Sequence, residues 1–156
     1  MNAEAAVKLL IEKGKKLATA ESCTGGMLGS LITAVSGSSA VYEFGFITYA
    51  NKAKESLIGV RHETLEKYGA VSSTVAREMA LGALSKSGAD IAVSVTGIAG
   101  PSGGSREKPV GLVYTAIAAN GSVTVKKLNL SGSREEIRKQ TCESVLQDIC
   151  DFLKKL

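Results

Sequence analysis

Apolar residues recur along the chain in two patterns, one typical of helices and the other typical of strands. Stretches in which apolar residues stand three or four positions apart predict helices, and these stretches are residues 3–16, 24–35, 51–57, 63–68, 74–86 and 133–154. Short runs rich in β-branched, aromatic or other apolar residues predict strands, and these runs are residues 17–20, 44–50, 90–96, 110–119 and 122–130. Helices and strands therefore alternate through most of the chain.

The order of these elements indicates the fold class. Residues 90–96 have the sequence DIAVSVT, which is apolar enough for a central strand that is buried on both faces. Asn120-Gly121 lies between the last two strands and is a strong signal for a β-hairpin. We therefore expect an α/β fold, a three-layer α/β/α sandwich on a mixed, mostly parallel sheet of about five strands with one antiparallel hairpin. A purely parallel, doubly wound sheet is the competing topology, and the hairpin counts against it.

Length and composition fit a single globular domain over residues 1–156. Of the 156 residues, 44% are hydrophobic and 22% are charged, and the formal net charge is +4. No apolar run approaches the ~20 residues that a membrane span needs, so we expect no membrane partner. The basic residues are scattered, and four Tyr and three Phe offer little stacking for bases. A small phosphate-bearing molecule explains the positive excess as well as a polyanion does, and a nucleic-acid partner is not expected.

One histidine and three cysteines restrict the chemistry further. A single histidine excludes a His-rich metal cage, and a Ser-His-Asp triad would have to use His62. His62 lies in a polar helix start without site-like surroundings, so we do not expect it to be catalytic. We expect neither a metal nor a cofactor. The cysteines form no C-x-x-C pair, which indicates reduced thiols and a cytoplasmic protein. Cys142 and Cys150 fall on the terminal helix, where they are expected to be small buried residues.

The segment AESCTGG, residues 20–26, joins a predicted strand to a predicted helix. Small hydroxyl residues and glycines there leave backbone N–H groups free at a helix N-terminus, where they can bind an anion or stabilise an oxyanion. Ser22 is placed to attack a carbonyl, while an N-capped helix with closely packed glycines is the alternative interpretation. Cys23 is a second candidate nucleophile because a helix N-terminus lowers a thiol pKa, but a Cys–His pair would need His62 nearby.

A serine hydroxyl needs a base, and the segment FITYANKAK at residues 46–54 offers one. A desolvated lysine can fall to a pKa of ~7–8 and take the place of histidine. Tyr49 and Lys54 lie at the end of a predicted strand and one helical turn further on, where both could face a site. A solvated lysine pair on a surface helix is the alternative, and it fits Lys52 better than Lys54.

Two further segments have the composition of ligand-binding loops. VTGIAGPSGG, residues 95–104, follows the apolar central strand at its carboxyl end, where open α/β sheets bind ligands. Its glycines allow a phosphate or an amide to approach the backbone, although a plain surface loop is the alternative. GSREEIR, residues 132–138, has a capping box at Ser133 and an arginine at the helix start, which suits a phosphate. Helix capping explains Arg134 equally well, and an ordinary surface position explains Arg138.

These segments strongly resemble the C-terminal domain of the competence-damage-inducible protein family, CinA, which includes stand-alone nicotinamide mononucleotide deamidases. The matching stretches are AESCTGG (20–26), GSSAVYEFGFITYANKAKESLIGV (37–60), YGAVS (68–72), VTGIAGPSGG (95–104) and KPVG (108–111). With the spacing between them, they cover nearly the whole chain. The family's fold is similar to the three-layer sandwich that the element order predicts.

The resemblance implies that the carboxamide of nicotinamide mononucleotide is hydrolysed to nicotinic acid mononucleotide and ammonia, with no metal. The family's motifs imply Ser22 as the nucleophile, Lys54 as the base and Tyr49 as an assisting hydroxyl. The substrate-binding residues expected around them are Thr24, Gly25, Gly26, Thr96, Gly97, Gly100, Arg134 and Arg138. Ser133 replaces the Asp of the family's G-D-R-x-x-[IV]-R segment, which leaves open which of the two arginines contacts the phosphate.

A second hypothesis is a non-catalytic module that binds a nucleotide or a partner, linked to competence or to the response to DNA damage. A small domain can keep a fold and lose its chemistry, but the presence of every candidate catalytic residue favours the enzyme. Assembly into a homodimer or a larger homo-oligomer is common in such folds and is expected here.

Overall fold

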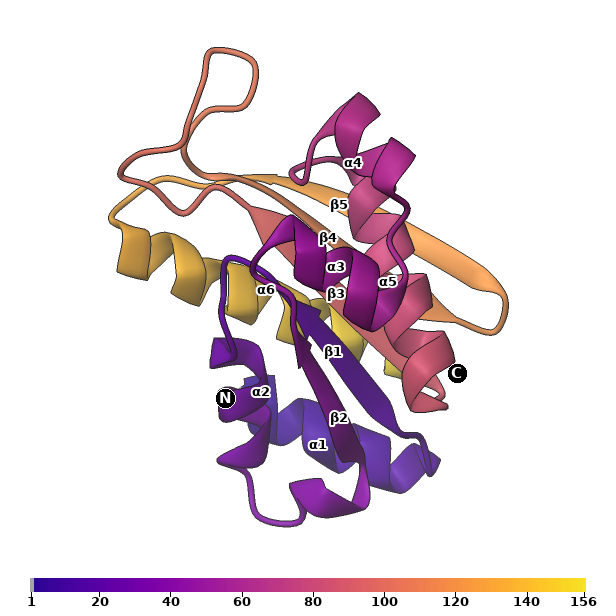
Figure 1. Ribbon diagram of the computed structural model, residues 1–156. Helices are drawn as coiled ribbons and strands as arrows, with labels where there is room; N and C mark the ends of the chain where they lie inside the picture. The colour runs from indigo at the N-terminus through magenta and orange to yellow at the C-terminus, as the bar shows by residue number, and fades with distance from the viewer. Residues whose placement is uncertain (1) are drawn as a thin grey trace.

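The computed structural model describes residues 2–156, in which a five-stranded sheet carries helices on both faces (Figure 1). The strand order is β2-β1-β3-β4-β5, where β1 is Leu17–Glu21, β2 is Tyr42–Ile47, β3 is Ile91–Gly97, β4 is Leu112–Ala119 and β5 is Ser122–Asn129. β1 is parallel to β2 and β3, whereas β4 is antiparallel to both β3 and β5. The mixed, mostly parallel sheet is confirmed, with β4 running against the other four strands.

Two layers of helices cover the sheet. They are α1 Asn2–Lys13, α2 Met27–Thr33, α3 Asn51–Ile58, α4 His62–Tyr68, α5 Ser73–Ser87 and α6 Arg134–Lys154, together with the short 3-10 helix η1 at Ser38–Ala40. α1, α2 and α6 pack on one face, and α3, α4 and α5 pack on the other (Figure 1). The predicted three-layer sandwich is therefore confirmed. Within the described residues, no helix is both long and apolar enough to span a membrane.

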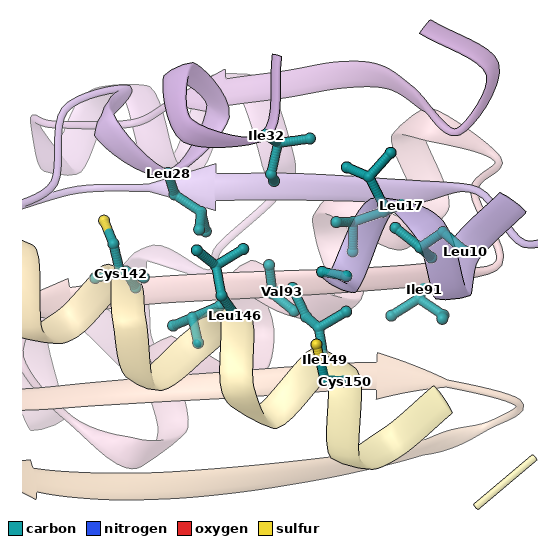
Figure 2. Packing of buried hydrophobic residues seen from close by; sticks show 14 of the residues in the cluster. Leu10, Leu17, Leu28, Ile32, Ile91, Val93, Cys142, Leu146, Ile149 and Cys150 are labelled. Atoms are coloured by element: carbon teal, nitrogen blue, oxygen red, sulfur yellow. The ribbon is translucent and has the colours of Figure 1, made fainter. Parts of the chain in front are cut away.

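Alternating side chains of the central strands reach both helical layers. Leu17 belongs to the cluster that contains Leu10 of α1, while the next residue, Ala18, belongs to the cluster on the α5 side. Every residue of β1 is buried, and so is all of β3 except its last residue, as a strand covered on both faces requires. Figure 2 shows the first cluster, in which Cys142 and Cys150 of α6 are small buried residues, as predicted.

Three predicted boundaries are wrong by three residues each. The helix expected to reach residue 16 ends at Lys13, because Gly14 has a φ of 62°, in the left-handed region. The helix expected from Thr24 begins three residues later, because Gly25 and Gly26 have φ values of 54° and 101°, in the left-handed region that interrupts a helix. The strand expected to reach residue 50 is β2, which ends three residues earlier. There Thr48 donates its N–H to the carbonyl of Glu21, and the chain leaves the sheet.

The connections between strands decide where a site can form. Asn120 and Gly121 both have positive φ, 51° and 75°, which is what the predicted tight hairpin between β4 and β5 needs. At the other end, the parallel strands β1, β2 and β3 finish at one edge of the sheet. The chain segments that follow these three strands therefore meet at that edge, where open α/β sheets bind their ligands.

Candidate active site

A cavity of about 330 Å³ lies at this edge of the sheet, and its volume is within the range of small-molecule sites. Its walls come from the β1–α2 turn, the start of α3, the residues before α5, the loop after β3 and the first residue of α6. The predicted site residues that line it are Ser22, Tyr49, Lys54, Thr96, Gly97, Gly100 and Arg134. The other predicted residues, Thr24, Gly25, Gly26 and Arg138, are in the β1–α2 turn or contact it instead.

Ser22 and Lys54 form a buried pair in the wall of the cavity. Lys54 Nζ lies 3.0 Å from Ser22 Oγ, and it donates to the carbonyl oxygens of Thr48 at 2.8 Å and Tyr49 at 3.2 Å. Only 1% of Lys54 is exposed. The backbone of Ser22 is fixed by its N–H, which donates to the carbonyl of Val95 in β3 at 3.0 Å. The fold thus brings the predicted nucleophile and the predicted base to hydrogen-bond distance.

Burial changes the acidity of the lysine. It lowers the pKa of the Lys54 ammonium from an ordinary value of 10.5 to about 8, because the charged form loses its hydration; a smaller effect of Cys23 acts in the opposite direction. A lysine with this pKa is half neutral near pH 8 and can accept a proton from a hydroxyl group. The pair therefore supplies a base for Ser22 without a histidine.

Glu21 anchors the end of β1, next to the predicted nucleophile Ser22. Its buried carboxylate accepts the backbone N–H of Leu28 at 2.9 Å and that of Gly29 at 3.0 Å, so it caps the N-terminus of α2. A Cβ at Gly29 would lie 2.8 Å from the Tyr42 hydroxyl and 3.5 Å from the Glu21 carboxylate. The missing side chain lets α2 approach the sheet closely, and the β1–α2 turn is held at its far end.

Arg138 of α6 holds the middle of the same turn. Its Nε donates to the carbonyl of Cys23 at 3.0 Å, and one of its terminal nitrogens donates to the carbonyl of Thr24 at 2.9 Å. Gly25 is also used inside the protein, since its N–H donates to the carbonyl of Ser22 at 3.1 Å. The sequence predicts substrate contacts for Arg138 and Gly25, but these donors bind backbone oxygens of the turn.

Tyr49 contributes its backbone to the pair and its phenol to the rim of the cavity. Its carbonyl accepts from Lys54 Nζ and lies 3.5 Å from Ser22 Oγ. Its phenol oxygen accepts from Arg134 at 3.2 Å, and 61% of the residue is exposed. The sequence predicts an assisting hydroxyl here, but in the described chain the phenol makes no hydrogen bond to Ser22 or Lys54.

Arg134 connects three walls of the cavity. Besides Tyr49, its guanidinium donates to the carbonyl of Gly100 at 2.8 Å. The predicted capping box of α6 is confirmed: Ser133 Oγ accepts from the Glu136 N–H, and the Glu136 side chain accepts from the Ser133 N–H. Of the residues at this helix start, Arg134 is the one that lines the cavity, so its guanidinium is the cationic group that an anion there would meet.

Thr96, a predicted site residue, ties the end of β3 to the segment before α5. Its hydroxyl donates to the carbonyl of Ala70 at 2.8 Å.

The motifs do not single out every residue that lines the cavity. Asn51, Val71 and Ser102 also line the cavity. Each lies inside one of the segments NKAK, YGAVS and VTGIAGPSGG, so the motif signal was present, but nothing local distinguishes these side chains from their neighbours.

Cys23 and His62 are the remaining candidates from the sequence. Cys23 lines the cavity, but burial raises the pKa of its thiol to about 11, so little thiolate exists at neutral pH. His62 lies on the exposed surface of α4, 3.0 Å from the carboxylates of Glu55 and Glu66, whose charges raise its pKa. In residues 2–156, no group of three or more His, Cys, Asp or Glu side chains could hold a metal ion. Of the two nucleophile candidates, Ser22 is the one with a base beside it.

The fold and the cavity define an α/β domain with a buried serine–lysine pair at the carboxyl ends of parallel strands. The family model of the CinA C-terminal domain matches residues 1–153. A CinA-like protein of Syntrophomonas wolfei is 50% identical over 145 residues, which cover 93% of this chain and 35% of that relative. The chain thus spans little more than a third of the length of the relatives that it matches.

Solved structures are similar over the whole domain. A CinA superfamily protein from Klebsiella pneumoniae has a TM-score of 0.96 at 34% sequence identity, covering 99% of this chain and 97% of that one. The competence/damage inducible protein CihA from Agrobacterium tumefaciens has a TM-score of 0.92 at 45% identity, covering 99% of this chain and 96% of that one. This chain belongs to the CinA C-terminal domain family.

Proposed function

We propose that this domain is a nicotinamide mononucleotide amidohydrolase, which converts its substrate and water to nicotinic acid mononucleotide and ammonia. The observation that carries the proposal is the 3.0 Å contact between Ser22 Oγ and the buried Lys54 Nζ in the wall of a cavity. Burial lowers the pKa of this lysine to about 8, which suits a general base near neutral pH.

In the first half of the reaction, neutral Lys54 takes the proton of the Ser22 hydroxyl while Oγ attacks the carboxamide carbon. The carbonyl oxygen becomes an oxyanion, which backbone N–H groups of the β1–α2 turn stabilise. Lys54 then gives its proton to the amide nitrogen, the carbon–nitrogen bond breaks, and ammonia leaves. The product of this half is an ester between Ser22 and the nicotinic acid group.

In the second half, water replaces ammonia. Neutral Lys54 takes a proton from the water molecule, whose oxygen attacks the ester carbon. The tetrahedral intermediate collapses, the bond to Ser22 breaks, and Lys54 returns the proton to Oγ. One lysine therefore serves as base and acid in both halves, and the chemistry balances without any further reactant.

Arg134 supports a mononucleotide as the substrate. Its guanidinium lies at the side of the cavity formed by α6, held by the Gly100 carbonyl and the Tyr49 phenol. A guanidinium binds a phosphate through two parallel N–H bonds, and the substrate has one phosphate at the end opposite the carboxamide. The cavity of about 330 Å³ is large enough for a small ligand.

The decisive assay is ammonia release from nicotinamide mononucleotide by the purified domain. Ser22→Ala and Lys54→Ala are each expected to lose at least ~10³-fold in kcat, while His62→Gln, on the exposed surface of α4, serves as the matched control and keeps its activity. Wild-type turnover by Ser22→Ala would refute the mechanism. Tight nucleotide binding in calorimetry without ammonia release would favour a non-catalytic binding module.

A further inference from the structure

Arg138, on α6, contacts the β1–α2 turn although the two segments are far apart in sequence. Its two hydrogen bonds, 3.0 Å to the Cys23 carbonyl and 2.9 Å to the Thr24 carbonyl, link residues 115 and 114 positions apart. The side chain is half-buried, and its helix is fixed by the buried neighbours Ile137 and Thr141. The guanidinium is therefore a rigid support for the turn rather than a mobile surface cation.

The two bonds fix the planes of two successive peptide units. In a trans peptide the C=O and N–H groups point in opposite directions, so a bond to the carbonyl also sets the direction of the N–H. The first unit joins Cys23 to Thr24, and its N–H belongs to Thr24. The second joins Thr24 to Gly25, whose N–H donates to the Ser22 carbonyl at 3.1 Å. Arg138 thus closes the turn around the nucleophile.

The N–H of Cys23 is free to act on a substrate. It shares a peptide unit with the Ser22 carbonyl, which the Gly25 N–H holds, and Cys23 lines the cavity. Within residues 2–156 this N–H has no hydrogen-bond partner, although the carbonyls of Ser22, Cys23 and Thr24 are all paired. An oxyanion formed on a carbonyl that Ser22 attacks needs such a donor, held in place before the reaction. The positive charge of Arg138 also stabilises negative charge near the turn. It lowers the pKa of the Cys23 thiol, against the larger rise that burial causes.

We infer that Arg138 is a positioning residue, which holds the β1–α2 turn so that the free Cys23 N–H faces the oxyanion, and that it does not bind the substrate's phosphate. This role rests on the proposed function, because it assumes that Ser22 attacks a carbonyl group. Arg138 belongs to the predicted substrate-binding set, so the inference replaces a contact with the substrate by a contact with the turn.

The kinetic test compares Arg138→Met and Arg138→Lys with Lys139→Met. Lys139 is the next residue on α6 and forms an exposed pair with Glu135 at 3.0 Å, so its variant is the matched control. For Arg138→Met we expect kcat for ammonia release to fall roughly 10- to 100-fold with KM within about twofold. Arg138→Lys, which can reach one carbonyl, is expected to lie between it and the wild type. A KM that rises while kcat stays constant would overturn the inference in favour of phosphate binding.

A second measurement does not depend on the substrate. A phosphonofluoridate phosphonylates an activated serine: the bond from Oγ to phosphorus forms, fluoride leaves, and the serine proton passes to Lys54. Mass spectrometry of the peptide that contains Ser22 gives the rate. We expect labelling about tenfold or more slower in Arg138→Met than in Lys139→Met. In Arg138→Ala, guanidinium at low, non-denaturing concentration is expected to restore the rate, whereas methylammonium is not.

The two measurements separate the inference from the proposed function. Labelling that depends on Arg138 in a protein that releases no ammonia from nicotinamide mononucleotide supports the inference and refutes the substrate. Equal labelling rates in all variants, or no labelling of Ser22 in the wild type, would overturn the inference. Thermal unfolding followed by circular dichroism shows which variants are folded, and the guanidinium rescue is decisive for a variant of reduced stability, since a merely misfolded chain is not restored by it.

Discussion

Lys54 is a lysine that folding buries, and Lys54→Met tests the energetic cost of that burial. Methionine keeps an unbranched side chain of similar length but cannot take up a proton. The wild-type protein must either desolvate the ammonium group or release its proton on folding, and the variant does neither. The difference in the free energy of unfolding between the two proteins is therefore expected to depend on pH.

The sign and size follow from the two pKa values. The ordinary value of 10.5 applies to the unfolded chain, and the value of about 8 applies to the folded protein. Between them the unfolded chain binds a proton that the folded protein does not, so the stability of the wild type rises with pH. Below pH ~8 both states bind the proton, and the full cost of burying the charge is present. At ~1.36 kcal/mol for each unit of difference between the two pKa values, this cost is about 3 kcal/mol. Most of this cost is relieved by pH ~10.

The assay is urea unfolding of both proteins, followed by circular dichroism, at several values between about pH 7 and 10. Other titrating groups are shared, so their effects cancel in the difference. We expect the stability of the wild type relative to Lys54→Met to rise by roughly 2–3 kcal/mol across this range. The lost bonds to the Thr48 and Tyr49 carbonyls cost ~1 kcal/mol each, which moves the whole curve but not its slope.

Lys52→Met is the matched control, because Lys52 is an exposed lysine two residues earlier in the same helix. Its stability relative to the wild type is expected to stay constant with pH. A difference curve for Lys54→Met as flat as that of the control would show that Lys54 titrates like a lysine in water. The burial argument would then be refuted, and the proposed reaction would lose its base.

Four further outcomes are expected from the same geometry. The kcat/KM for ammonia release should rise about tenfold per pH unit and level off above about pH 8, since Lys54 must be neutral to act as a base; a fall over this range would contradict it. Cys23→Ala should keep its activity within a few-fold, because a thiol with a pKa of about 11 is not the nucleophile, and a hundredfold loss in the ammonia assay would contradict this. Arg134→Gln should raise KM about tenfold or more with a smaller change in kcat, which initial-rate kinetics measure; an unchanged KM would remove the phosphate contact. Gly82→Ala should destabilise the fold by roughly 2–3 kcal/mol in urea unfolding, because its Cβ would lie 1.8 Å from the Ile58 carbonyl oxygen, and a variant as stable as the wild type would contradict the close packing of α3 on α5.

Local patterns were sufficient for most of the fold. The apolar run of β3, the Asn120-Gly121 hairpin and the capping box at Ser133 all depend on neighbouring residues, and the structure confirms them. Two of the boundaries that failed lie beside the site. Gly25 and Gly26 adopt a left-handed conformation to form the β1–α2 turn, and apolar periodicity alone contains no information on that conformation.

The site was predictable as a set of segments but not as a set of contacts. Motifs located Ser22, Lys54, Thr96 and Arg134, all of which line one cavity. They did not indicate that the Tyr49 carbonyl, rather than its phenol, faces the serine–lysine pair. Which atom of a residue faces a site depends on the path of the backbone after the strand ends, and that path is fixed by contacts with other elements.

The sequence by itself determined which elements form, their order and the chemical groups available at the ends of the strands. Only the tertiary structure decided how those groups behave. Lys54 and Ser22 are 32 positions apart, and the pKa of the lysine falls because packing removes water from its ammonium. Arg138 donates a hydrogen bond to the Cys23 carbonyl of the β1–α2 turn, 115 positions away in sequence. Desolvation and long-range hydrogen bonds exist only after the chain has folded, which is the physical reason why a local pattern does not contain them.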